Sequence, residues 1–233
     1  MNLGEILFGA VLLGLGAQQM KKGAERLGKG LRGAGGARVE KDTKRRLPKR
    51  VGVVRRGGMT MDLREVRSLD DRINAIRDRI RKGKVDPKIL AWARKQVTRK
   101  CGADWCIKEK DTAAEIVAIF EGMRRDVRYT SDVAGVDTYA NPRRTLEHRA
   151  GDCDDYSALG CAALMSIGIP CRLKVIRTKD SSTWNHIYIE AGSPKDRPSR
   201  WIPLDASVNV RAGWEAPRSM VAETRIFEVS PYL

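Results

Sequence analysis

One cysteine of this chain stands in an acidic stretch that opposes its ionisation. The stretch "RAGDCDDYSALGCAALMSIGIPC" begins at Arg149, and in it Cys153 is surrounded by Asp152, Asp154 and Asp155. A cysteine nucleophile reacts as a thiolate, and neighbouring carboxylates make that anion harder to form. Cys153 is therefore either a structural thiol or a nucleophile whose local geometry outweighs the nearby charges.

The residues that follow predict a helix that begins at Cys153. Apolar side chains recur at steps of three and four from Tyr156, and counting back three residues puts the cysteine on the same buried face. Gly168, followed two residues later by a proline, predicts the helix end. Asp152 suits the N-cap, and first-turn aspartates favour the positive helix end. Free N–H groups and a nearby imidazole would then lower the pKa of the thiol below its usual value of roughly 8.5.

The chain has two histidines, so the search for that imidazole is short. His148 lies in a polar stretch before Cys153 and suits a solvated loop or a helix end. His186 lies in "TWNHIYIE", whose aromatic and β-branched residues predict a strand. The period of a strand puts Trp184, His186 and Tyr188 on one face.

A second strand, predicted in "SRWIPLDAS", supplies an acidic partner. Pro203 indicates that this strand lies at a sheet edge or carries a bulge. If the two strands pair antiparallel, His186 and Asp205 can meet across the ladder and can face the helix start that carries Cys153. A cysteine nucleophile, a histidine base and an orienting aspartate form the triad of a thiol enzyme.

Two other interpretations of these residues stay open. In the first, Cys153 is a buried inert thiol, His186 is an isolated strand residue and Asp205 belongs to a turn. In the second, the three aspartates beside Cys153 hold Mg²⁺ or Ca²⁺, although the stretch lacks the spaced oxygen ligands and the glycine of a calcium loop. We expect neither a metal ion nor a cofactor.

Three blocks, "GDCDDYSALGCAALMSIGIPCRLKVI", "WNHIYIE" and "WIPLDAS", resemble the transglutaminase-like cysteine-enzyme superfamily. The upstream segment "VRYTSDVAGVDTYANPRRTLEHRAGDCDD" is similar to transglutaminase-like proteins of bacteria, phages and prophages. The resemblance covers roughly Asp111 to Asn209. It implies an α+β, papain-like fold in which the cysteine-bearing helix packs on an antiparallel sheet. It also implies Cys153 as the nucleophile, His186 as the general base and Asp205 as its partner.

The reaction that the resemblance implies is acyl transfer at an amide bond of a protein or peptide. Cys153 would attack the carbonyl, and His186 would take and return the proton. The backbone N–H of Cys153 is a natural oxyanion donor, and Trp184 or Asn185 could assist. Family members include peptidases, amidases, transamidases and inactive structural forms, so hydrolysis and cross-linking both fit. The alternative function is a structural or virion-associated protein that uses the fold as a scaffold.

Composition divides the chain into four segments. These are a short hydrophobic segment (residues 1–20), a basic glycine-rich linker (residues 21–58), a helical extension (residues 59–110) and the transglutaminase-like domain (residues 111–233). Of the net charge of +16, residues 21–56 contribute +11 through 14 Lys/Arg and 3 Asp/Glu. This basic run is poor in aromatic and β-branched residues, so we expect it to be flexible.

The helical extension is predicted from periodicity and capping residues. Apolar residues at alternating steps from Val66 to Ile80 predict an amphipathic helix that starts near Asp62. A second helix has Pro87 in its first turn. A third begins at an Asp111 cap and leads into the segment that resembles the superfamily.

The N-terminal segments suggest anionic partners. The basic run suits lipid head groups or non-specific nucleic acid phosphates. Residues 6–20 carry no charge, but as a helix they would span about 22 Å, less than the roughly 30 Å of a bilayer core. We expect residues 1–56 to attach the protein to an anionic membrane on its cytoplasmic side, or to lie within a phage virion. A linker without a partner and a helix buried against the body are the alternatives.

The five cysteines bear on the redox compartment. Cys101 and Cys106 could form a disulfide, since two cysteines alone are a weak zinc signal. Cys161 and Cys171 suit small core positions. A reducing compartment fits these assignments and would keep the thiol of Cys153 reduced.

Overall fold

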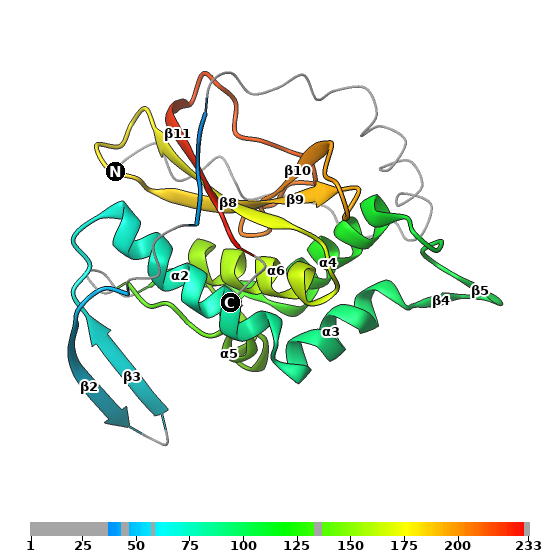
Figure 1. The fold of residues 1–233 in the computed structure, drawn as a ribbon, viewed down its shortest axis with the longest axis horizontal. Coiled ribbons are helices and arrows are strands. Elements are labelled where there is room, and N and C mark those ends of the chain that lie inside the picture. Colours follow the sequence, from blue (N-terminus) through cyan, green and yellow to red (C-terminus); the bar gives the residue numbers. More distant parts are fainter. Residues whose placement is uncertain (1–36, 43–46, 57–58, 133–136, 231–233) are drawn as a thin grey trace, which may run out of the picture.

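A single sheet and a group of helices make up the main layers of the computed structural model, which describes residues 37–42, 47–56, 59–132 and 137–230 (Figure 1). The helices cover one face of the sheet. They are α2 (Leu69–Lys84), α3 (Pro87–Val97), α4 (Thr112–Asp126), α5 (Pro142–His148) and α6 (Cys153–Ser166). The sheet has the order β1 (Arg38–Glu40), β11 (Val221–Glu228), β8 (Cys171–Thr178), β9 (His186–Ser193) and β10 (Arg200–Leu204).

The sheet is antiparallel except at one edge. Strands β8, β9 and β10 follow one another as a meander, and β11 returns to pair antiparallel with β8. Strand β1 pairs parallel with β11. Strand β10 is the other edge, where Pro203 is tolerated as the sequence indicated. The predicted α+β architecture, with a cysteine-bearing helix packed on this sheet, is confirmed.

Helix α6 lies at the centre of the molecule, between the sheet and the other helices (Figure 1). It begins at Cys153 as predicted, and the chain leaves it through Gly168, whose φ of 82° suits glycine. Burial is not confined to the one face that the periodicity predicted, because residues 155–164 are all buried. Gly160 permits this close packing, since a Cβ there would lie 2.6 Å from Cδ1 of Ile189 on β9.

Helices α2 and α3 belong to the same core as α6. Ile76 of α2, Ile89 of α3 and Leu159 of α6 share one buried cluster, so the helices of the expected extension pack on the core. Helix α2 also starts later than expected. Its N-cap is Ser68, whose hydroxyl accepts a hydrogen bond from the backbone N–H of Asp71 at 3.2 Å. The predicted positions of Pro87 and the Asp111 cap are confirmed.

Parts of the expected basic linker form strands instead. After β1, Asp42 accepts hydrogen bonds from Arg81 at 2.9 and 2.7 Å and from the backbone N–H of Ser230 at 3.1 Å, which ties this segment to the core. Further along, β2 (Arg50–Arg56) and β3 (Met59–Arg64) form a separate hairpin. Two shorter pairs are β4 (Lys100–Cys101) with β5 (Asp104–Trp105), and β6 (Arg128–Tyr129) with β7 (Ala150–Gly151).

The apolar run at residues 6–20 lies outside the described residues. Among the residues that the structure does describe, no helix has both the length and the apolar character needed to cross a bilayer. The predicted membrane contact of residues 1–56 therefore stays a prediction.

Four of the five cysteines form disulfides, Cys101 with Cys106 and Cys161 with Cys171. The first pairing was one of the options that the sequence left open. The second corrects the expectation of free core thiols: both residues are buried, but the turn from α6 into β8 brings their Cα atoms to 5.4 Å, a separation that a disulfide spans. The reducing compartment expected from the sequence stays a prediction. Cys153 is the free cysteine.

Candidate active site

The local sequence fixes Cys153 at the N-terminus of α6. The carboxylate of Asp152, the N-cap, accepts hydrogen bonds from the backbone N–H groups of Asp154 at 3.2 Å and Asp155 at 3.3 Å. The preceding residues form β7, which pairs parallel with β6 through the bond from the Thr130 N–H to the Gly151 carbonyl at 2.9 Å. The cysteine is therefore held by a helix cap on one side and a short strand pair on the other.

The predicted contact between His186 and Asp205 is present. His186 is the first residue of β9 and Asp205 follows the last residue of β10, and the antiparallel register joins Leu204 to Ile189. The Nε2 atom of His186 lies 2.6 Å from Oδ2 of Asp205. The other carboxylate oxygen of Asp205 accepts a hydrogen bond from the Ser207 hydroxyl at 2.7 Å. With Nε2 engaged, the Nδ1 atom of His186 is left for a second partner.

The thiol of Cys153 lies beside the same strand end. The backbone N–H of Ile187, the residue after His186, is hydrogen bonded to the sulfur. Cys153 and Asp205 line one narrow recess, together with Ser157 of α6 and Tyr188 of β9, and this recess has no room for a water molecule. Three chain segments that are far apart in sequence thus converge at the start of α6, as the sequence predicted.

The ionisation of Cys153 differs from the prediction. The pKa of the Cys153 thiol is raised to about 12, first by burial and then by the charges of Asp154 and Asp152, while the hydrogen bond from the Ile187 N–H lowers it. The expected fall of this pKa assumed that the helix end and an imidazole would dominate. Burial and the neighbouring carboxylates outweigh them, so the cysteine rests as the neutral thiol.

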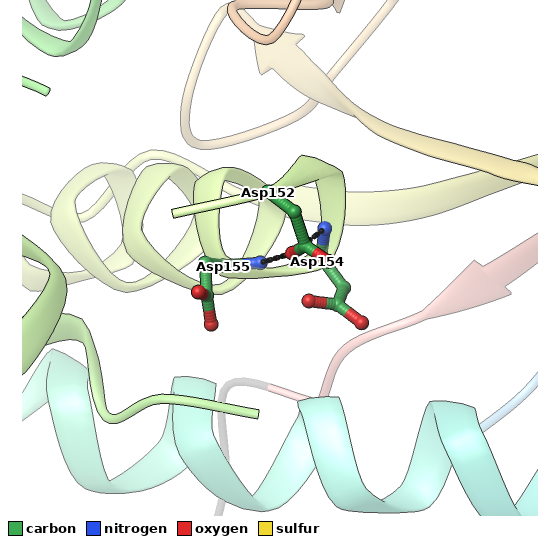
Figure 2. Close-up of side chains that lie close together, drawn as sticks. All are labelled: Asp152, Asp154 and Asp155. Atoms are coloured by element: carbon green, nitrogen blue, oxygen red, sulfur yellow. Dashed lines mark hydrogen bonds between the residues drawn. The ribbon is translucent and has the colours of Figure 1, made fainter. Parts of the chain in front are cut away.

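The three aspartates form a compact group in the first turn of α6, with the Asp152 carboxylate directed at two backbone nitrogens (Figure 2). Asp155 is buried and accepts a hydrogen bond from the Ala140 N–H at 2.8 Å. Burial raises the pKa of Asp155 to about 7. Burial also raises the pKa of Asp154 well above its usual range, and a hydrogen bond between its side chain and Asp152 adds to the effect. These acids therefore do not all carry a full charge near neutral pH.

The same aspartates are the described residues that could hold a metal ion, since one oxygen from each lies within 4.8 Å of the others. Two of the carboxylates already accept backbone N–H groups, one as the helix cap and one from Ala140. These bonds account for the positions of two of the three carboxylates: Asp152 caps α6, and Asp155 ties the segment before α5 to the helix.

Two residues near the site were not found from the sequence. Tyr129 of β6 pairs with Gly151 and is 48% exposed. Burial of its hydroxyl raises the pKa of Tyr129, and the nearby charge of Cys153 adds to this. The other is Ser207, two residues after Asp205. A serine at that spacing is a recognisable turn signal, whereas nothing in the sequence marks Tyr129.

The remaining candidates lie apart from this arrangement. His148 is the exposed last residue of α5, as expected for a helix end. Trp184 and Asn185 precede β9 rather than belonging to it, and the Asn185 side chain bonds to Thr178.

The family comparison covers this whole site. Residues 102–206 match the model of the transglutaminase-like superfamily. Residues 102–206 are therefore similar to a transglutaminase-like domain. The matched segment includes the start of α6, all of β9 and the turn after β10, and with them Cys153, His186 and Asp205. It begins nine residues before the boundary expected at Asp111.

Solved structures with similarity to this chain include a candidate cysteine protease from Cytophaga hutchinsonii, with 23% identity and a TM-score of 0.38 over 60% of this chain and 46% of that one. A candidate protease from Parabacteroides distasonis has 11% identity and a TM-score of 0.39, covering 58% and 30%. A protein described as a TGase has 16% identity and a TM-score of 0.35, covering 66% and 36%. The chain spans less than half the length of each. A search of curated proteins found no significant match.

Proposed function

We propose that the transglutaminase-like domain catalyses thiol-dependent acyl transfer at an amide bond of a protein or peptide, with Cys153, His186 and Asp205 as its triad. The observation that carries the proposal is the 2.6 Å contact of His186 with Asp205, beside the recess that Cys153 lines. An imidazole held through Nε2 presents its other nitrogen as a base, which is the arrangement a cysteine nucleophile needs.

The neutral resting thiol determines the first step. His186 removes the proton from Cys153 as the sulfur attacks the carbonyl carbon, because burial makes a free thiolate costly before the substrate arrives. The oxyanion that forms lies near the backbone N–H of Cys153 at the start of α6, and the hydroxyl of Tyr129 is a candidate second donor. His186 then gives its proton to the leaving amine, and a thioester to Cys153 remains.

The second half of the reaction restores the cysteine. Water or an amine attacks the thioester carbonyl, His186 takes a proton from the attacking group, and the sulfur leaves and is reprotonated. Water gives hydrolysis, as in a peptidase or amidase, and a lysine amine gives a cross-link, as in a transamidase. Asp205 holds the imidazole and stabilises its positive charge in both halves.

A scaffold function, for example in a virion, is the second candidate. One observation favours it: the pKa of the thiol is raised to about 12, and the thiol lies in a recess with no room for a water molecule. On this alternative, Cys153 is inert because neither a base nor a substrate reaches it.

Thiol labelling distinguishes the two. Under non-reducing conditions we expect iodoacetamide to modify Cys153 alone, since the other four cysteines are in disulfides. If the triad is functional, His186→Ala should slow this labelling near neutral pH by roughly 10²-fold, the usual contribution of a general base. His148→Ala, which changes the exposed histidine of α5, is the matched control and should leave the rate unchanged. Equal rates in all three proteins would favour the scaffold.

A further inference from the structure

The β2–β3 hairpin exposes apolar side chains that the rest of the molecule does not cover. Ten large hydrophobic residues are exposed among the described residues, and five of them lie on these two strands. They are Val51, Val53, Val54, Met61 and Leu63. The two strands pair with each other and contact little else, and Figure 1 shows them projecting from the body. A lone two-stranded hairpin is only marginally stable in water. This hairpin would therefore be stabilised by a partner that packs against its apolar side chains.

The register divides the hairpin into two unlike faces. Val54 pairs with Met61, and Leu63 lies on the same face opposite Gly52. The side chains of this apolar face are 38%, 44% and 45% exposed for Val54, Met61 and Leu63. On the other face, Val53 is opposite Asp62 and Arg55 is opposite Thr60. The face of Val54, Met61 and Leu63 is therefore the more apolar of the two, and the body of the protein does not cover it.

The charge around the apolar face is strongly positive. Residues 49–67 contain six Lys/Arg and two Asp/Glu. Arg50 and Arg64 contact Asp62, and no described residue pairs with Arg55 near the tip. In the sequence the hairpin follows the uncharged run at residues 6–20 and the basic run after it. A partner must therefore offer both an apolar surface and negative charge.

We propose that the β2–β3 hairpin docks on an anionic lipid bilayer. Val54, Met61 and Leu63 contact the acyl chains at the level of the head groups, and the arginines of the hairpin bind lipid phosphates. The free strand edges keep the hairpin at this level, because unpaired backbone groups are costly in the hydrocarbon core. Nucleic acid fits less well, since the hairpin has no aromatic residue for base stacking and phosphates gain nothing from an apolar face. Two copies of a hairpin with this excess of positive charge repel each other, which disfavours self-association.

Two neighbouring valines provide a matched test. Val54→Thr and Val53→Thr remove the same methyl group, keep a β-branched residue and change no charge, but the two residues lie on opposite faces at nearly equal exposure, 38% and 39%. Vesicle flotation with the full chain should show binding to phosphatidylglycerol-containing vesicles that weakens at high salt, with little binding to pure phosphatidylcholine. We expect Val54→Thr to weaken binding by roughly fivefold, because one methyl group that would contact the acyl chains is replaced by a hydroxyl. We expect Val53→Thr to leave binding within about twofold of the wild type.

A triple variant strengthens the test. Val54→Thr, Met61→Thr and Leu63→Thr together should abolish flotation and leave the thermal midpoint and Cys153 labelling unchanged, because the hairpin lies outside the core. If the triple variant floats as well as the wild type does, the proposal is overturned and another segment is responsible for the binding. Equal losses of binding in Val53→Thr and Val54→Thr would also overturn it. So would light scattering that shows a dimer of the wild type and a monomer of Val54→Thr. If the wild type binds duplex DNA but not vesicles, the partner is nucleic acid and the lipid proposal is overturned.

Discussion

The core around α6 and the β2–β3 hairpin place similar residue types in opposite environments. In the core, valine and leucine side chains are buried around a central helix, and the polar groups of the site hydrogen bond to one another. In the hairpin, the same types are exposed on both faces and stand among arginines. The core therefore builds a site from groups that cannot move independently, whereas the hairpin has surface available for a partner.

The largest expected effect is on catalysis in the core. His186→Ala and Asp205→Ala should each lower kcat/KM on a protein or peptide amide substrate by roughly 10³-fold or more, because the two groups act as one unit. The double variant should lose little beyond the worse single variant. Steady-state kinetics of all three variants measure this, and the V53T protein serves as the control with normal rates. Losses that multiply fully would mean that the contact between the two side chains has no catalytic consequence.

Two glycines test how tightly each region is packed. Gly160→Val places side-chain atoms against Ile189 and Met123, where even a Cβ would lie 2.6 and 3.0 Å from them, so we expect a loss of about 3 kcal/mol in the free energy of unfolding. In the hairpin, a Cβ at Gly52 would contact only Leu63, at an ordinary 3.5 Å from its Cδ1 atom. Gly52→Val should therefore change the free energy of unfolding by less than about 0.5 kcal/mol. Urea denaturation measures both. A comparable loss at both positions would contradict the contrast between the two regions.

An effect spread over several pH units is expected in the pH dependence of stability. The folded state raises the pKa of Asp155 to about 7, so between about pH 4 and pH 7 the folded protein holds a proton that the unfolded chain has released. The stability that this proton contributes is present at acid pH and is lost as the pH rises through 7, at up to about 1.4 kcal/mol per pH unit. Asp155→Asn should flatten this part of the profile. The exposed Asp104→Asn is the control, and a slope unchanged by Asp155→Asn would show that this carboxyl does not titrate as described.

How much of this could be predicted from the sequence differs between the two regions for physical reasons. The period of α6, its Asp152 cap, the strand at His186 and the edge position of Pro203 are local signals, and each was predicted. The meeting of His186 with Asp205 followed from them once the strands were paired. The hairpin was not predicted, because Arg50–Arg56 and Met59–Arg64 lie in a basic, glycine-containing stretch whose composition indicated a linker.

The ionisation of the site could not be predicted either. The sequence identifies the charged residues beside Cys153 but not how far the folded protein shields them from solvent. Burial decides the pKa of the thiol and of Asp155, and burial of α6 depends on α2 and β9, which are distant in the chain. Tyr129 is the same kind of case, since only the parallel pairing of β6 with β7 brings it beside the cysteine.

The two disulfides and the free thiol differ in their access to small reagents. Cys101 and Cys106 close an exposed turn between β4 and β5, whereas Cys161 and Cys171 are buried beneath the sheet at the far end of the same helix that begins with Cys153. A mild reductant that keeps the partly buried Cys153 thiol free of oxidation meets the outer disulfide first and the inner one last. The protein can thus tolerate conditions in which its surface loop is opened while the anchor of its central helix remains closed.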